Sequence, residues 1–335
     1  MRHIRTKISD VARLAGVSTA TVSRVLSNPA MVSADTRAAV QSAVAATGYR
    51  PNMAARNLRH RRTGGIVALV PDLANPFFSK ILSGIASVLG PAGYNLLIAD
   101  TRTSGAERLL DYAEPSRADG LIVLDGSLPA EALRGRVPLV EACEWVPDLA
   151  APRVRIDNAS AAGLAVAHLA DLGHRRIGHV SGPAGNVLTQ ARLAGTAAAL
   201  AARGLPFPQT AIHDGDFSLE AGQRAAALWL AQPADHRPTA LTFASDAMAC
   251  GFIGAVQRHG IRVPQDVSVV GFDDIELIAH ITPALTTIRQ PHAALGRVAA
   301  QRLLAVLAGQ PGAEDTILPV ELVIRSSTAA PAPGR

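Results

Sequence analysis

The sequence feature that most constrains the fold is an alternation of short apolar runs with amphipathic segments between residues 64 and 330. Short apolar runs of this kind are typical of strands buried on both faces of a parallel sheet. Strands that alternate with helices predict open parallel sheets covered by helices on both faces. The runs form two series, which predicts an α/β body of two lobes. The expected strands are Ile66–Val70, Asn95–Ala99, Leu121–Leu124 and Leu139–Ala142 in the first lobe, and Ile177–Ser181, Ala240–Ala244 and Val267–Gly271 in the second. The expected helices are Phe77–Leu89, Ala159–Leu172, Leu188–Arg203, Leu219–Ala231 and Asp246–His259.

Polar and aromatic residues follow these apolar runs, at the edge where open parallel sheets bind ligands. They include carboxylates, one arginine and several rings. Carboxylates and arginine can bridge vicinal hydroxyl groups, and rings can stack on a sugar or a base, so we expect a small polar effector. The candidate effector-binding residues are Phe77, Phe78, Asp125, Arg192, Phe217, Ser245 and Asp273.

Structural roles are open for part of this set. Ser245, Asp246 and Asp274 could equally be helix N-caps, which favour Ser and Asp. Phe77 and Phe78 could equally belong to the core of the first lobe.

Positive charge is concentrated at the N-terminal end. Residues 1–62 contain eleven Arg or Lys against Asp10 and Asp35, whereas the rest of the chain carries 21 basic and 25 acidic residues. A compact basic segment on a mildly acidic body predicts a polyanionic partner for that segment alone.

The basic segment contains the pattern of three short helices. Val11, Leu14 and Ala15 lie at helical spacing, Gly16 can close the first helix with a positive φ, and Ser18 can cap a second one. Val22, Val25 and Leu26 are expected to face the core, and a third helix is expected between Ser33 and Gly48. Three helices of this length around a tight turn predict a helix-turn-helix unit.

In such a unit the second helix enters the major groove by its N-terminal end. Thr19, Ala20 and Arg24 are the candidate base-reading residues, because Arg can donate two hydrogen bonds to guanine and small residues can contact thymine methyl groups. Ser18, Thr21 and Ser23 are the candidate phosphate contacts. The alternative is an ordinary three-helix bundle with a solvated polar surface.

A short helical segment, Asn52 to Arg59, follows between Pro51 and two glycines. Leu58 is an apolar residue among arginines, which would suit a wedge inserted between base steps of the minor groove. Asn52, Ala55 and Leu58 are the candidate minor-groove hinge residues. The alternative is that Leu58 packs on the body.

The chain resembles the LacI/GalR family of bacterial transcription regulators along essentially its whole length. The residues that carry the resemblance are Asp10–Ala12, Ala15–Ser18, Thr21–Leu26, Gly48–Asn52, Asn75–Phe78, Leu172–Ile177, Ser245–Ala249 and Pro283–Ile288. The resemblance implies a periplasmic-binding-protein-like body of two doubly wound parallel-sheet lobes behind the helix-turn-helix head and hinge helix. It also implies a homodimer that places paired hinge helices in the minor groove of a near-palindromic double-stranded DNA operator.

The resemblance further implies a division of the chain and a set of contacts. The head would span residues 1–50, the hinge and linker 51–63, the N-lobe 64–159 with 291–319, the C-lobe 160–290 with 320–330, and a tail 331–335. Arg192 and Asp273 are the implied direct effector contacts, with Phe78, Phe217 and Ser245 lining the pocket.

The identity of the effector is less constrained. The segments Val140–Trp145, Gly215–Gly222 and Glu321–Arg325 are most similar to the cytidine-repressor branch. Asn186 and Leu188 depart from the Arg and Thr with which the purine-repressor branch reads its base. A nucleoside is therefore expected first and a sugar second.

Other classes of protein are disfavoured. No nucleophile elbow, phosphate-cradling loop or pair of histidines at ligand spacing is present, so neither enzymatic activity nor a metal or cofactor is expected. Cys143 and Cys250 lack metal-ligand spacing. No apolar run approaches the roughly 18 residues of a membrane span, and no signal peptide is recognisable, so a cytoplasmic protein is expected. A periplasmic-type solute-binding protein without DNA function is the alternative, and residues 1–62 argue against it.

Overall fold

The computed structural model describes residues 6–49, 62–103, 111–310 and 315–332. The chain divides into two compact units, Met1–Thr63 and Gly64–Arg335. Each unit is described by itself.

The described part of the first unit, residues 6–49, is a bundle of three helices, α1 (Ile8–Ala15), α2 (Thr19–Ser27) and α3 (Ala34–Thr47). A single 3-10 turn, η1 (Pro29–Met31), connects the last two. Gly16 ends α1 with φ +65°, and the Ser18 hydroxyl accepts the backbone N–H of Thr21 at 3.1 Å at the start of α2. The predicted helix-turn-helix is confirmed, including the residues that close and open its turn.

The core of this unit is narrower than the sequence pattern indicates. Leu26 is 36% exposed, so the expectation that it faces the core was wrong, and Leu14 on α1 is 58% exposed. Short helices that cross one another bury only a narrow stripe of each surface, and small residues fill it here. The buried residues are Val11, Ala12, Val22, Val25, Val40 and Ala43.

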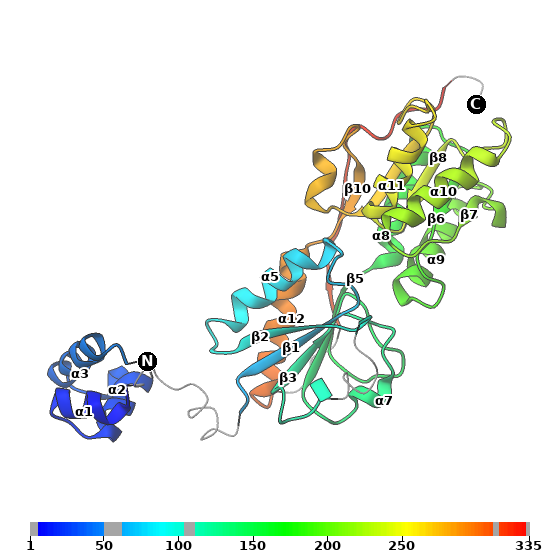
Figure 1. The fold of residues 1–335 in the computed structure, drawn as a ribbon. Coiled ribbons are helices and arrows are strands. Elements are labelled where there is room, and N and C mark those ends of the chain that lie inside the picture. The colour runs from blue at the N-terminus through cyan, green and yellow to red at the C-terminus, as the bar shows by residue number, and fades with distance from the viewer. Residues whose placement is uncertain (1–5, 50–61, 104–110, 311–314, 333–335) are drawn as a thin grey trace. The chain divides into compact units, whose positions relative to one another are not determined.

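The second unit contains two six-stranded sheets with helices on their faces, which confirms the predicted two-lobed α/β body (Figure 1). The N-lobe sheet has the strand order β11-β5-β4-β3-β1-β2, and all of its pairs are parallel. Its strands are β1 (Gly65–Val70), β2 (Asn95–Asp100), β3 (Gly120–Val123), β4 (Leu139–Ala142), β5 (Arg153–Ile156) and β11 (Thr316–Leu318). Among the described residues of this lobe, the helices are α5 (Phe77–Leu89), α7 (Ala130–Leu133) and α12 (His292–Leu307).

The C-lobe sheet has the order β12-β10-β9-β8-β6-β7 and is parallel except for the edge strand β12, which runs antiparallel to β10. Its strands are β6 (Ile177–Val180), β7 (Ile212–His213), β8 (Ala240–Phe243), β9 (Ser268–Asp273), β10 (Thr286–Arg289) and β12 (Glu321–Val323). Its helices are α8 (Asn158–Asp171), α9 (Val187–Ala201), α10 (Leu219–Ala231) and α11 (Asp246–Gln257), with the 3-10 turns η2 (Gln209–Ala211) and η3 (Glu276–Ala279).

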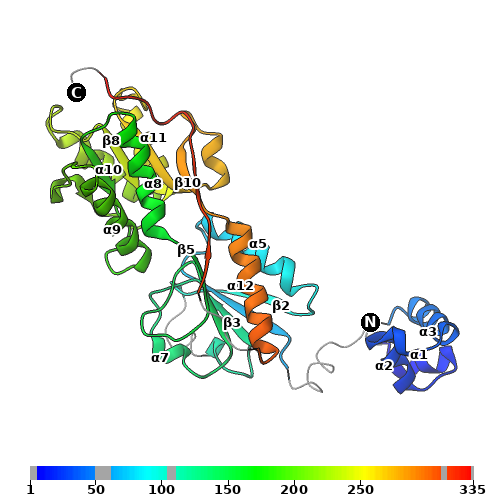
Figure 2. The same cartoon turned by 180° about the vertical axis from the view of Figure 1, so that it is seen from behind.

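Helices cover the sheets in pairs (Figures 1 and 2). In the N-lobe α5 and α12 lie side by side on one face of the sheet. In the C-lobe α8 packs against α9 and α10 packs against α11. Successive residues of β6 point to opposite faces of the sheet, so Ile177 joins the apolar cluster that contains α8, whereas Val180 joins the cluster of α10 and α11.

The chain passes between the two sheets three times. It leaves the N-lobe after β5 and enters α8, returns from β10 to α12, and leaves again from β11 to β12. Residues of both lobes therefore lie next to these three segments, and the carboxyl ends of the strands approach the same region (Figure 2).

The edges of the sheets differ from the sequence prediction. The strand at Asn95–Ala99 was expected to be buried, yet it is the edge strand β2 and leaves Leu97 49% exposed. The strands β5 and β10 were not predicted, nor were the terminal strands β7, β11 and β12, whose two or three residues carry too little periodicity.

The contact between α5 and α12 leads to a stability prediction. A Cβ atom at Gly296 would lie 2.0 Å from the carbonyl oxygen of Ile81, so the backbones approach more closely than any side chain allows. We expect Gly296→Ala to lower the free energy of unfolding by about 1–3 kcal/mol, the usual cost of overpacking, in urea titrations. The control is Gly254→Ala in α11, where the nearest atom is 3.9 Å away. That control should be neutral or slightly stabilising, and an equal loss in both variants would contradict the packing argument.

Candidate functional site

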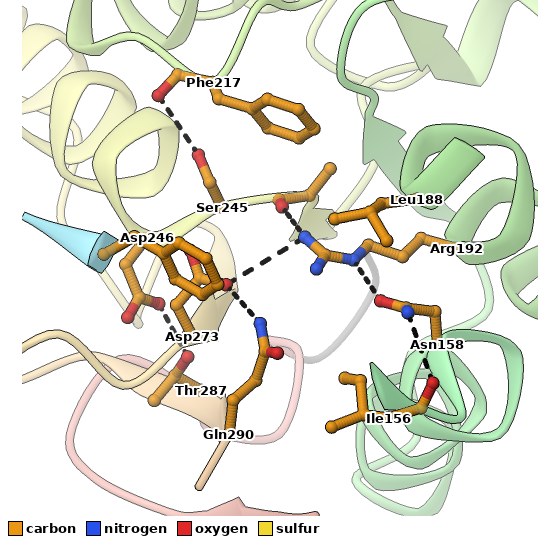
Figure 3. Close-up of polar contacts among 12 residues, drawn as sticks. Ile156, Asn158, Leu188, Arg192, Phe217, Ser245, Asp246, Asp273, Thr287 and Gln290 are labelled. Carbon is orange, nitrogen blue, oxygen red and sulfur yellow. Dashed lines mark hydrogen bonds and ion pairs between the residues drawn. The ribbon is translucent and has the colours of Figure 1, made fainter. Parts of the chain in front are cut away.

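Arg192 in α9 is the central polar residue of the C-lobe site, and its side chain is only 3% exposed (Figure 3). Its Nε donates to the Asn158 Oδ1 at 2.9 Å and its Nη1 to the carbonyl oxygen of Ala244 at 2.5 Å. The guanidinium carbon lies 3.7 Å from the centre of the Phe272 ring. Because a buried cation needs compensating partners, these contacts fix the direction in which the guanidinium points.

Asp273 ends β9 and faces Arg192, with 4.0 Å between its Oδ1 and the Nη1 of that residue. The same oxygen accepts the Nε2 of Gln290 at 2.7 Å. Burial raises the pKa of the Asp273 carboxyl to about 7, although Arg192 and Gln290 act in the opposite direction. Burial lowers the pKa of Arg192, and its carboxylate neighbours oppose that change. The pair therefore offers a donor and an acceptor side by side in a region shielded from water.

Ser245 and Phe217 lie beside this pair (Figure 3). The Ser245 hydroxyl caps α11 by accepting the backbone N–H of Met248 at 3.3 Å, and it donates to the carbonyl oxygen of Phe217 at 3.5 Å. Phe217 is half-buried and has φ +66°. The N-cap alternative for Ser245 is thus confirmed as a structural role, and a contact with the effector stays a prediction.

Asp246 and Asp274 are not helix N-caps, so that alternative was wrong for both. Asp246 is the first residue of α11, and its carboxylate accepts the backbone N–H of Ile275 at 3.0 Å. Asp274 forms ion pairs with Arg289 at 2.5 Å and Arg325 at 2.6 Å. Ser245 occupies the cap position of α11, which leaves the Asp246 carboxylate free to contact the loop after β9.

The N-lobe contributes Asp125, which is buried just after β3. Its carboxylate accepts the hydroxyl of Thr101, and it accepts the backbone N–H and the hydroxyl of Ser127 at 2.8 Å and 2.6 Å. All these partners lie in the N-lobe, so Asp125 is not brought into direct contact with Arg192 in this structure.

Glu144 is a buried N-lobe carboxylate that the sequence reasoning did not select. It accepts the backbone N–H of Gly126 at 2.8 Å, and the side chain of Asn186 in the C-lobe lies close enough to act on its pKa. Burial raises the pKa of Glu144, and both of these groups oppose the change. The two lobes meet here, and the residue missed in the sequence could have been found from its place directly after β4.

Phe77 and Phe78 begin α5 and are both buried in the N-lobe core. Their rings meet edge to face with 4.9 Å between centroids, and Phe77 meets the ring of His292 in the same way at 4.9 Å. The core alternative describes their packing, and a role in lining the effector pocket stays a prediction for both.

Asn158 and Gln290 were also missed. Asn158 begins α8 and Gln290 follows β10, so both stand where the chain crosses between the sheets. Amides at such positions carry no chemical signature in the sequence. Their role became visible only through the buried groups that they contact, Arg192 and Asp273.

In the head, the candidate DNA-binding residues are at the surface. Ser18, Thr19, Ala20 and Arg24 are exposed, whereas Thr21 and Ser23 are half-buried. Within the described part of the chain the guanidinium of Arg24 has no ion-pair partner. The hinge candidates Asn52, Ala55 and Leu58 lie outside the described residues.

The histidines near β6 have structural partners. His174 contacts Thr239 at 2.8 Å and Ser268 at 3.0 Å, and His179 contacts Thr242 at 2.9 Å. Among the described residues no group of three or more His, Cys, Asp or Glu is arranged to hold a metal ion. In the same residues, no helix has the length and apolar character needed to cross a membrane.

A helix-turn-helix unit on a body of two parallel-sheet lobes with buried polar groups at the strand ends defines a DNA-binding regulator built on a periplasmic-binding-protein-like domain. Residues 7–52 match the profile of bacterial regulatory proteins of the lacI family, and residues 166–328 match that of a periplasmic binding protein-like domain. The chain belongs to the lacI family of bacterial regulatory proteins.

Similar proteins span nearly the whole chain. The HTH-type transcriptional repressor CytR of Escherichia coli (strain K12) is 40% identical over 330 residues, which is 96% of each chain. The ribose operon repressor of Haemophilus influenzae is 37% identical over 303 residues, 89% of this chain and 90% of the relative. A crystal structure of the lac repressor dimer bound to operator and the anti-inducer ONPF has a TM-score of 0.83 at 31% identity, covering 97% of this chain and 99% of the other.

Proposed function

We propose that this protein is a transcriptional repressor whose binding to a near-palindromic operator is controlled by a small polar effector held between the lobes. The observation that carries the proposal is the buried Arg192–Asp273 pair, which lies in a body attached to a basic helix-turn-helix head. The effector would complete the hydrogen bonds of this pair, draw the lobes together, and so change the operator affinity of the head. This role requires that the protein act in the cytoplasm, where the chromosome is.

A nucleoside is the proposed effector, and a mono- or disaccharide is second. Both ligands present vicinal hydroxyl groups. The Asp273 carboxylate can accept hydrogen bonds from these groups, and the Arg192 guanidinium can donate hydrogen bonds to them. Asn186 and Leu188, which differ from the Arg and Thr of the purine-repressor branch, favour a ligand other than a purine base. The sugar alternative is supported by a solved CelR–cellobiose complex, which has a TM-score of 0.74 at 33% identity.

We propose that the protein acts as a homodimer. A near-palindromic operator needs two heads related by two-fold symmetry. Exposed apolar residues on the N-lobe edge around β2, including Leu73, Leu97 and Ile98, would suit a subunit contact. The lac repressor structure noted above contains a dimer on operator DNA.

Operator binding tests the proposal directly. Duplexes selected by the full-length protein from a random pool should converge on a near-palindrome. Between about 50 and 200 mM salt the affinity should fall by about 10³ to 10⁵, as it does for proteins that make 6–10 phosphate contacts. Fluorescence anisotropy would measure this dependence. The absence of any enriched duplex would contradict the proposal and favour the solute-binding alternative.

A thermal-shift screen of nucleosides and sugars addresses the effector. A ligand that binds only the native state raises the melting temperature, and one present at 100 times its Kd stabilises the fold by about 2.7 kcal/mol. Hits should then change operator affinity in the anisotropy assay.

A further inference from the structure

Asp246 is a fully buried carboxyl group next to the effector-site residue Asp273. The two residues follow the adjacent strands β8 and β9, at the edge where Arg192 also lies. A buried carboxyl group is retained only when its surroundings supply partners. The contacts of Asp246 therefore indicate which part of the structure its carboxyl group holds in place.

Asp246 and Asp273 lie next to each other, and each has its own polar partners (Figure 3). The Asp246 carboxylate accepts the backbone N–H of Ile275 at 3.0 Å and the hydroxyl of Thr287 at 2.6 Å. Asp273 accepts the Nε2 of Gln290 at 2.7 Å and faces Arg192. The Asp246 carboxylate thus clasps the turn after β9 and the strand β10 to the start of α11.

The turn that is held in this way has an uncommon backbone conformation. Asp273 has φ +124° and Asp274 has φ +63°, and few residues other than glycine adopt such values. Conformations of this kind persist only when the surrounding structure determines them. The strand β9 also passes directly over the carboxylate, because a Cβ atom at Gly271 would lie 2.2 Å from the Oδ1 of Asp246.

We propose that Asp246 is a positioning residue for the effector: its clasp sets the turn that aims the Asp273 carboxylate at Arg192, and its charge state controls that of Asp273. This inference rests on the proposed effector site. Asp246 itself touches no ligand, since Asp273 and the turn lie over it.

The electrostatics of Asp246 and Asp273 support the coupling of their charge states. Burial and the neighbouring Asp273 raise the pKa of Asp246 well above its ordinary value. The other charged or titratable groups that act on the pair are Arg192 from α9, Cys250 from α11 and Cys143 after β4. Glu144 and His179 act on it through Arg192. Two adjacent buried carboxyls do not both ionise readily, so the ionisation of one opposes the ionisation of the other.

A double-mutant cycle without ligand tests the clasp. The proteins are wild type, Asp246→Asn, Asp273→Asn and the double variant, and the measurement is the urea midpoint between pH 5.5 and 8. Folding takes up protons where a folded-state pKa is raised, so wild-type stability should fall as the pH rises towards 7 and above. Asp246→Asn should reduce the loss of stability with rising pH, and this reduction should be larger in the wild-type background than in the Asp273→Asn background. An equal reduction in both backgrounds would overturn the inference, because Asp246 would then act alone.

Ligand binding supplies a readout that a purely structural role would not move. With cytidine as the probe, Asp246→Asn should shift the acidic limb of the affinity profile to lower pH by about one unit, since Asp273 loses a like-charged neighbour. Thr287→Val, which removes the hydroxyl that donates to Asp246, should shift the limb in the same direction by a smaller amount, because a carboxyl that loses a donor ionises less readily. Asp235→Asn, on the C-lobe surface, is the control and should match wild type. If wild-type protein does not bind cytidine, the proposed effector is wrong, and the ligand-free cycle still decides the role of Asp246.

Discussion

Arg192→Met should abolish the response of operator binding to the effector while leaving operator binding itself intact. Arg192 lies in the C-lobe and not in the head, so the DNA contacts do not depend on it directly. In the body its loss would remove the donor that faces Asp273 and the partner of the Asn158 side chain. Methionine fills a similar volume but donates no hydrogen bond.

The same change should destabilise the body. Removal of one partner from a buried charge pair typically costs about 3–5 kcal/mol, because the remaining charge stays buried without compensation. Part of that cost should be recovered when Asp273→Asn is added, so the two changes should not be additive. Urea unfolding would measure the free energies, and anisotropy with and without effector would measure the response.

Arg203→Met is the matched control, because Arg203 is exposed just beyond the end of α9. It should alter neither property. An Arg192→Met protein that still changes its operator affinity on addition of the effector would refute the assigned role of the arginine.

Arg24→Ala should reduce discrimination between operator and non-operator DNA, with little effect on the fold of the head. Arg24 is exposed on α2, whereas the bundle is held together by buried residues such as Val22 and Val25. A bidentate contact between arginine and guanine contributes about 1–3 kcal/mol of discrimination against the wrong base. That corresponds to a loss of about 5- to 150-fold in the specificity ratio, since about 1.4 kcal/mol is a factor of ten.

The measurement compares the affinity for the selected operator with that for a scrambled duplex at one salt concentration. Arg13→Ala is the control, because Arg13 lies on α1 and already pairs with Asp10 at 2.7 Å. An equal loss of affinity for both duplexes in Arg24→Ala would instead indicate a phosphate contact.

The regular elements near the middle of each sheet could be predicted from the sequence. Uninterrupted apolar runs mark β1 and β3, and helical spacing marks α5 with the bounds that the structure gives. The head was equally readable, because Gly16 and Ser18 encode the turn locally. These features depend on residues close together in the chain, where periodicity and capping act directly.

The candidate site was only partly readable. The rule that ligands bind at the carboxyl ends of parallel strands selected Arg192 and Asp273, which the structure brings to 4.0 Å from each other. It also selected Phe77 and Phe78, which pack in the N-lobe core, since the rule gives the edge of the sheet and not the direction of a side chain.

The sequence alone determined the two-lobed body, the helix-turn-helix head and the arginine that the C-lobe buries. Only the tertiary structure decided what that arginine contacts and which carboxylate supports another. Asn158 lies 34 residues before Arg192, and Thr287 lies 41 residues after Asp246. Contacts at such separations arise when helices and strands far apart in the chain pack together on a sheet. Local periodicity fixes the strands and helices, but the order of the strands fixes which buried groups meet.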